Sequence, residues 1–137
     1  EFVDYCVKVN RGRKPEGLEP FKPIIGCEMY VAPRSLYDKE EGDEICTRLI
    51  LLAKNFTGYK NLVKLVSDSW TKGLMGETPR TDFNELEKHK EGIIVCAPCL
   101  KSVISKRILN DDLQGASKAL DWFKYVWGND FYMCILI

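Results

Sequence analysis

Four short apolar runs, separated by segments with helical periodicity, constrain the fold of this chain more than any other feature. The runs are residues 24–32, 49–53, 93–97 and 131–137. Between them, apolar side chains recur at helical spacing in residues 59–70 and 113–127, and the second segment closes at Gly128. Because helical crossovers connect strands that run in the same direction, we predict an α/β fold with these four strands parallel, within boundary errors of about 2–4 residues.

The remaining segments are shorter or more polar. Asp82 and Glu85 have the spacing of a capping box, which predicts a short helix that ends at Gly92. Gly and Pro punctuate several connections. We expect a further helical stretch at about residues 102–109 and loops at residues 11–20, 35–44 and 71–81.

Both ends of the sequence fall inside predicted secondary structure. Helical spacing starts directly at Glu1 with no capping residue before it, and the last apolar run stops at Ile137. We therefore expect a piece of a longer chain that is marginally stable or self-associates. Such a piece exposes a strand edge and apolar faces that neighbouring segments would otherwise cover.

The composition fits a single soluble domain. Of the 137 residues, 45% are apolar and 29% are charged, and twenty basic residues balance twenty acidic ones. Domains that bind nucleic acid electrostatically usually carry a basic excess, so the zero net charge argues against DNA binding by this chain alone. The apolar runs are too short to span a membrane, and no signal-peptide pattern opens the sequence.

The six cysteines do not have the spacing of a small secreted disulfide scaffold. Cys6, Cys27, Cys46 and Cys134 stand alone in apolar or mixed surroundings, where buried free thiols are expected. This usage indicates a reducing, cytoplasmic setting.

Cys96 and Cys99 form a C-x-x-C pair at the end of the third apolar run. A structural zinc site would need two further ligands, and the sequence has no second pair. A thiol oxidoreductase is an alternative, because a strand, this motif and a helix follow one another as in thioredoxin-like proteins. Those proteins pack a later proline against the dithiol, whereas no proline follows Pro98 here, so we expect two buried thiols.

Glu28 lies in the middle of the first apolar run. Strand alternation places it on the same face as Ile24, Gly26 and Tyr30. If both faces of the sheet are covered, the carboxylate must be paired, protonated or bound to a metal. If the strand lies at an edge, the carboxylate faces water. The alternation pattern leaves both alternatives open.

The other polar residues form no recognisable catalytic constellation. His89, the single histidine, lies in the charged segment 85–92 and is expected on a solvated helix face. One histidine cannot build a multi-histidine metal site, and the glycines match no phosphate-binding pattern. Ser67, Ser69 and Ser102 have no base beside them in a known motif, so a nucleophilic hydrolase is not predicted.

Several stretches together resemble the N-terminal polymerase-and-histidinol-phosphatase (PHP) domain of bacterial DNA polymerase III alpha subunits. The order and spacing match over essentially the whole chain, in residues 21–32, 49–67, 79–82, 86–100 and 122–132. The pair "KPIIGCE" and "LLAKNFTGYKNLVKLVS" is specific to that family. The resemblance implies an α/β fold that is a portion of a distorted (β/α)7 PHP-type barrel with mainly parallel strands. Residues 1–137 would form a single partial PHP-like domain, with the other ligand-bearing strands outside it.

The resemblance also implies metal-ligand positions. In the family, the glutamate of "GCE" and the cysteine after the third apolar run lie in a site for zinc or manganese, and these positions are Glu28 and Cys99. The family histidine before "LxLLAKN" is replaced by Arg48, whose permanent positive charge opposes a metal. We expect Arg48 to pair with Glu28 instead, and we expect no catalytic metal cluster and no cofactor in the isolated chain.

For function, the resemblance implies DNA replication. We expect a scaffold-like segment of an alpha subunit, inactive in isolation, whose parent is a DNA-directed DNA polymerase (a nucleotidyltransferase). Its partners would be the rest of that subunit and, as in some members, the proofreading exonuclease subunit, with DNA reached only through the parent protein. The alternatives are a thiol oxidoreductase that uses Cys96 and Cys99, a free-standing PHP metal phosphoesterase, which would need more histidines, and an altered gene fragment without selected function.

Overall fold

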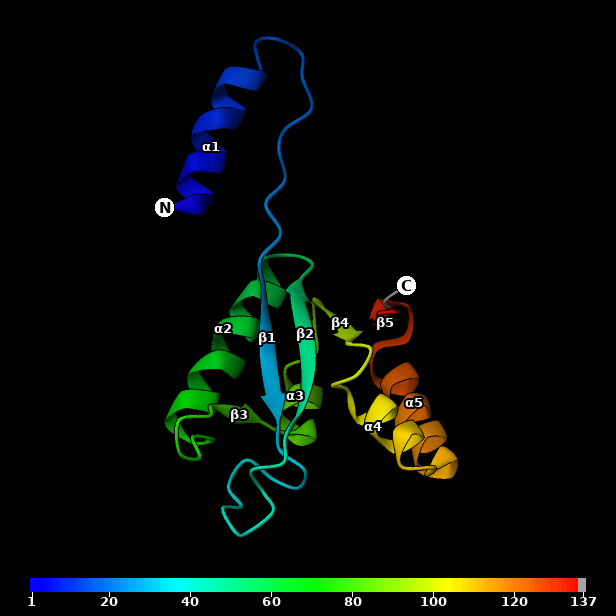
Figure 1. Ribbon diagram of the computed structural model, residues 1–137. Helices are drawn as coiled ribbons and strands as arrows, with labels where there is room; N and C mark the ends of the chain where they lie inside the picture. Colours follow the sequence, from blue (N-terminus) through cyan, green and yellow to red (C-terminus); the bar gives the residue numbers. More distant parts are fainter. Residues whose placement is uncertain (136–137) are drawn as a thin grey trace.

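The strands of this chain form one mixed sheet in the order β3-β1-β2-β4-β5 (Figure 1). The computed structural model describes residues 1–135. Its strands are β1 (Gly26–Val31), β2 (Thr47–Ala53), β3 (Arg80–Thr81), β4 (Ile93–Ala97) and β5 (Phe131–Met133). Its α-helices are α1 (Phe2–Arg13), α2 (Phe56–Thr71), α3 (Phe83–Lys88), α4 (Val103–Leu109) and α5 (Leu113–Trp127), and a single 3-10 turn, Gly128–Asp130, follows α5. The α/β class predicted from the apolar runs is confirmed.

Strand β2 runs against its neighbours. It pairs antiparallel with both β1 and β4, whereas β3 is parallel to β1 and β5 is parallel to β4. Four of the five strands therefore point the same way, and the prediction of four parallel strands is wrong for β2. The cause is the connection between β1 and β2, which contains no helix, so the chain returns directly beside the strand it has just left.

Side-chain caps fix where four of the helices begin, and one of these caps is Asp112 at the start of α5. Asn55, Asp82 and Ser102 each accept a hydrogen bond from a backbone N–H in the first turn of α2, α3 and α4, respectively. The helix that Asp82 opens ends at Lys88, before Gly92, so the predicted end is four residues too late. Gly92 has a positive φ of 72° and forms the turn into β4.

The ends of the predicted strands and loops also differ. Strand β3 forms at the end of the segment 71–81, which was predicted to be entirely loop. The last strand was predicted over residues 131–137 but ends at Met133. Residues 136 and 137 of that prediction lie outside the described part of the chain.

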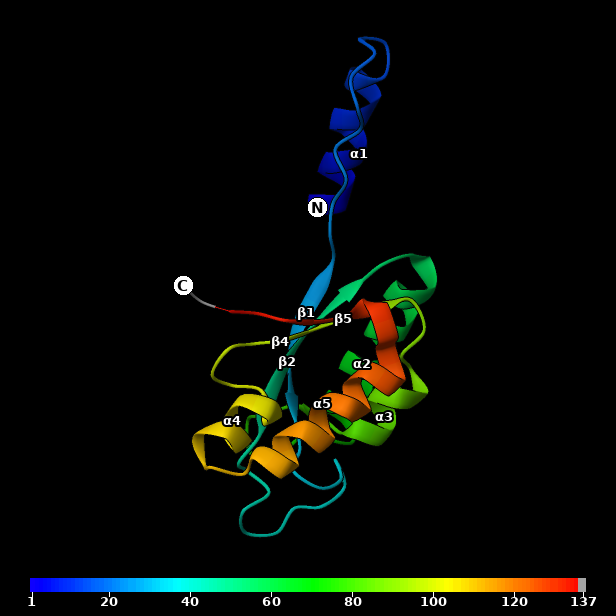
Figure 2. The same ribbon diagram turned by 90° about the vertical axis from the view of Figure 1, so that its right-hand side faces the viewer.

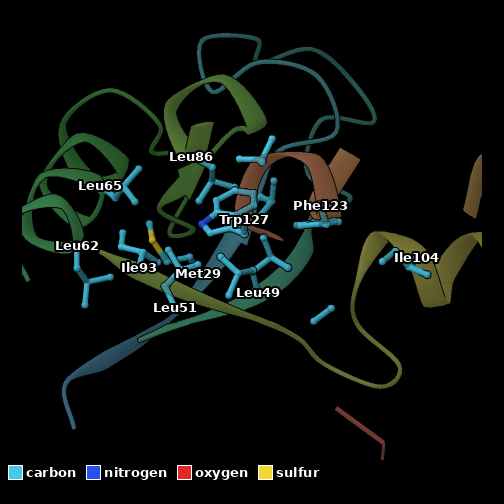
Figure 3. Close-up of a cluster of buried hydrophobic side chains, with 14 of the residues drawn as sticks. Met29, Leu49, Leu51, Leu62, Leu65, Leu86, Ile93, Ile104, Phe123 and Trp127 are labelled. Carbon is cyan, nitrogen blue, oxygen red and sulfur yellow. The ribbon is translucent and has the colours of Figure 1, made fainter. Parts of the chain in front are cut away.

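The hydrophobic core lies on one face of the sheet. Helices α2, α3 and α5 lie on the same side of β1 and β2 in the turned view (Figure 2). Apolar residues at alternate positions of the strands point toward these helices and are buried, as Figure 3 shows for Met29, Leu49, Leu51 and Ile93 against Leu62, Leu65, Leu86 and Trp127. The opposite face of β1, β2 and β4, here named the open face, carries the half-buried or exposed residues Glu28, Tyr30, Arg48, Ile50, Leu52, Ile94 and Cys96.

Helix α1 stands away from the sheet at the end of an extended connection, residues 14–25 (Figures 1 and 2). The Asn10 side chain ties this connection to the helix, because it donates to the Phe21 carbonyl at 2.7 Å and accepts from the Phe21 N–H at 2.6 Å. None of the helices described over residues 1–135 has the length and apolar character needed to cross a bilayer.

Candidate functional site

Two of the predicted site positions, Arg48 and Cys99, lie near one end of the sheet, and Glu28 lies in the middle of β1 within reach of Arg48. Strands β1, β3, β4 and β5 finish at that end of the sheet, and β2 begins there because it runs in the opposite direction. The Arg48 N–H donates to the Lys101 carbonyl at 2.8 Å, so the segment after β4 lies beside the start of β2. Because β2 is antiparallel to β1 and β4, Arg48 at its start lies beside the carboxyl ends of those two strands. This is the end of the sheet where α/β proteins place their sites.

Glu28 and Arg48 form an ion pair on the open face. Arg48 Nη1 lies 3.2 Å from Glu28 Oε1, and the two side chains are 29% and 49% exposed, respectively. The Arg48 guanidinium also lies over the ring of Tyr30, its partner in the strand register, at 4.7 Å from the ring centre. The predicted pairing is confirmed. Glu28 combines features of the two alternatives, because its carboxylate is paired with Arg48 and is also half-exposed.

Cys99 lies in the turn that follows β4 and is half-buried with a free thiol. Within residues 1–135, one group of three or more His, Cys, Asp or Glu side chains has ligand atoms close together, and it contains neither Glu28 nor Cys99. A two-metal hydrolytic site needs several anionic or neutral donors and an open water position. A carboxylate already paired with a guanidinium, plus one thiol, does not fit that requirement.

Cys96 lies close to Cys134, which is on the neighbouring segment. Burial, followed by the proximity of Cys134, raises the pKa of the Cys96 thiol above its ordinary value. A dithiol oxidoreductase depends on a nucleophilic cysteine with a lowered pKa. The environment of Cys96 therefore argues against the oxidoreductase alternative.

His89 is not on a solvated helix face, so that prediction is wrong. Its side chain is 15% exposed, and its Nε2 lies 3.5 Å from Glu85 Oε2. The charged residues around it in sequence suggested solvent, but the turn after α3 directs the imidazole toward α2, where Asp68 is buried. The spacing of Glu85 and His89, four residues apart, is the signal that the sequence offered.

Arg80 is a buried residue whose role was not recognised from the sequence. The side chain is fully buried and donates hydrogen bonds to four backbone carbonyls, at 3.0 Å to Gly73, 2.9 Å to Asp43, 3.3 Å to Leu36 and 2.9 Å to Asp38. Three of these carbonyls belong to the loop between β1 and β2. These hydrogen bonds from Arg80 therefore fix the conformation of the loop between β1 and β2.

Two carboxylates complete the anchoring of the same loop. Asp82 caps α3 with one oxygen and accepts the Leu36 N–H with the other at 2.9 Å. Arg34 makes a two-pronged contact with the buried Asp43, at 2.9 and 2.7 Å. Hydrogen bonds from Arg34 and from the Glu40 backbone lower the pKa of Asp43 to about 2. The segment "PRTD" thus acts on the loop through Arg80 and Asp82.

The PHP domain family matches residues 1–135 of this sequence. The chain belongs to the PHP domain family. It is 42% identical over 130 residues to the DNA polymerase III subunit alpha of Borreliella burgdorferi, which covers 93% of this chain and 11% of that protein. The Thermus aquaticus protein of the same name is 41% identical over 115 residues, 82% of this chain and 9% of the relative. The Chlamydia muridarum protein is 39% identical over 113 residues, with shares of 81% and 9%.

The chain spans about a tenth of the length of these relatives. It is a PHP-domain segment that matches DNA polymerase III alpha subunits from several bacteria, and the resemblance identified from the sequence is confirmed. Neither the phosphoesterase nor the oxidoreductase alternative gains support from these matches or from the geometry around Glu28 and Cys96.

Proposed function

We propose that this PHP segment serves a bacterial replicative DNA polymerase alpha subunit as a scaffold without hydrolytic activity of its own. The ion pair between Glu28 and Arg48 carries the proposal, because it places a permanent cation on the carboxylate that would otherwise bind a metal. Glu28 and Cys99 are then residual metal-ligand positions. The names of the relatives supply the connection with DNA replication.

The fold of the whole domain is part of the same proposal. We place residues 1–137 within a single partial PHP-like domain that belongs to a distorted (β/α)7 barrel in a longer, cytoplasmic chain. The half-exposed apolar side chains of the open face support this, since a barrel would cover them with further strands. The partners are then the rest of the alpha subunit and its proofreading exonuclease subunit, and DNA is reached through the parent protein.

A hydrolysis assay tests the absence of catalysis. Chelator-treated chain is supplied with Mn²⁺ or Zn²⁺ and given bis(para-nitrophenyl) phosphate, and we expect turnover no higher than that of the free metal. Glu28→Gln should behave identically. Metal-dependent turnover that Glu28→Gln abolishes, or two or more metal ions held tightly per chain and lost in Glu28→Gln, would overturn the proposal.

The scaffold role has a separate test. Sedimentation of the chain with a purified proofreading exonuclease subunit should show a complex that persists when Glu28 is replaced by Gln, since no metal is needed. Absence of a complex, with both proteins folded by circular dichroism, would remove the exonuclease subunit from the proposed partners.

A further inference from the structure

Three polar side chains converge between α2 and the end of α3, in a cluster that does not include Glu28, Arg48 or Cys99. Asp68 lies in the last turns of α2, Glu85 lies in α3, and His89 follows α3 directly. One ligand atom from each lies within 4.8 Å of the other two. Their side chains are 8%, 14% and 15% exposed, respectively, so the cluster is largely removed from solvent.

One atom of each side chain lacks a hydrogen-bond partner within the described part of the chain. These atoms are Asp68 Oδ2, Glu85 Oε2 and His89 Nε2, and each is inaccessible to solvent. Asp68 as a whole is only 6% exposed. A buried polar atom without a partner destabilises the folded state, so three of them in one place indicate a missing ligand that would satisfy all three.

The second oxygen of each carboxylate is already held by lysine. Asp68 Oδ1 lies 3.1 Å from Lys72 Nζ and 3.8 Å from Lys64 Nζ, and Glu85 Oε1 lies 3.2 Å from Lys88 Nζ. The lysines therefore orient the carboxylates and leave Oδ2 and Oε2 for the cluster. Outer groups that fix ligating carboxylates in this way are a common feature of metal sites.

We propose that Asp68, Glu85 and His89 bind one zinc ion, which joins α2 to α3. Two carboxylate oxygens and one imidazole nitrogen suit zinc, whereas magnesium and calcium prefer oxygen ligands alone. Ligand atoms at about 2.0–2.2 Å from a tetrahedral zinc lie roughly 3.4 Å apart. The separation of Glu85 Oε2 and His89 Nε2, 3.5 Å, is close to that spacing. A water molecule is the fourth ligand, and the ion links the last turn of α2 to the end of α3.

The sequence contains a single histidine, which makes the test direct. In the whole chain, heteronuclear NMR of the imidazole reports His89 alone. One equivalent of Zn²⁺ added to chelator-treated protein should shift the Nε2 signal and leave Nδ1 protonated. Asp68→Asn and Glu85→Gln should each weaken zinc binding at least tenfold in calorimetric titration, while Cys99→Ser should leave it unchanged.

Free thiols could also take up zinc, so Co²⁺ serves as a spectroscopic probe. A cobalt complex at this site should show visible bands without the near-ultraviolet charge-transfer band of a thiolate ligand. A thiolate band that disappears in Cys99→Ser would overturn the proposal. So would an imidazole that remains doubly protonated with equimolar Zn²⁺ at neutral pH, because the cluster would then be a hydrogen-bonded ion group. Neither result depends on the folding of the Asp68 and Glu85 variants.

Discussion

Arg80 holds the loop between β1 and β2 by donating hydrogen bonds to the backbone carbonyls of Leu36, Asp38 and Asp43. Arg80→Met would leave these carbonyls, and that of Gly73, without these donors inside the protein. We expect the free energy of unfolding to fall by about 3–5 kcal/mol, because each unsatisfied buried group carries a desolvation cost. Urea unfolding measures the change.

Arg11→Met is the matched control, because it removes the same side chain from an exposed position in α1. The control should change the free energy of unfolding by less than about 0.5 kcal/mol. Equal effects of the two substitutions would contradict the anchoring role of Arg80.

Asp43 should make the free energy of unfolding depend on pH in the acid range. Its pKa is lowered to about 2 in the folded chain by Arg34, so the carboxylate stabilises the fold above its unfolded pKa. That contribution should be lost as the pH falls from about 4 toward 2. Asp43→Asn should flatten the pH dependence of urea unfolding over this window.

Asp121→Asn, on an exposed position of α5, is the control for acid sensitivity. Its unfolding should keep the pH dependence of the unmodified chain. If Asp43→Asn also keeps that dependence, the contact between Asp43 and Arg34 does not form in solution.

The ion pair of Arg48 with Glu28 should matter little for stability. Both side chains are partly exposed, and exposed ion pairs contribute about 0–1 kcal/mol. We therefore expect Arg48→Ala to lower the free energy of unfolding by no more than about 1 kcal/mol, even with the loss of its contact with Tyr30. A loss several times larger in urea unfolding would show that Arg48 is a folding residue and weaken its interpretation as a replaced metal ligand.

At the level of elements, α2 approaches the start of β4 through two glycines. A methyl group at Gly58 would collide with the backbone carbonyl of Gly92. Gly58→Ala should therefore cost at least about 2 kcal/mol of unfolding free energy, although alanine ordinarily favours a helix. Thermal unfolding compares this variant with Gly12→Ala in α1, where an added methyl group meets no atom within 4 Å. The control should be neutral or stabilising, and a stabilising effect at both positions would contradict the close approach.

The elements themselves were largely predictable, whereas the direction of one strand was not. Apolar periodicity located α2 and α5, and the Asp82 cap located the start of α3, because these signals are local. The direction of β2 depends on the conformation of residues 32–46, which connect it to β1. That conformation is held by Arg80, which is distant in the sequence. No local pattern in a charged loop contains that information.

The candidate sites divide in the same way. The pairing of Glu28 with Arg48 followed from a family position and from charge, and it needed only two adjacent strands to meet. The cluster of Asp68, Glu85 and His89 requires α2 and α3 to pack against each other, so the sequence placed His89 in solvent. The charged neighbours of His89 in the sequence predicted an exposed side chain, but the packing of α3 against α2 buries it beside Asp68.

At the scale of the whole molecule, the open face should drive self-association. Ile50, Leu52 and Ile94 are only half-buried there, and Tyr132 on β5 is exposed beside them. Sedimentation velocity should show a mass that rises with protein concentration. Tyr132→Lys should reduce this association, whereas Tyr125→Lys, on the exposed side of α5, should not. A monomer at all concentrations would contradict this expectation.

The separation of α1 from the sheet divides the chain into two parts of unequal resistance to proteases. The extended connection contains Glu16 in an exposed turn. The longer loop also contains glutamates, at positions 40, 41 and 44, but hydrogen bonds from Arg34 within the loop and from Arg80 of β3 hold that loop in place. A glutamate-specific protease should therefore cut first after Glu16 and release α1 as a peptide. The sheet, its three covering helices and the Arg80 anchor should remain as a resistant fragment, so we expect residues from about 22 to 135 to unfold as one cooperative unit.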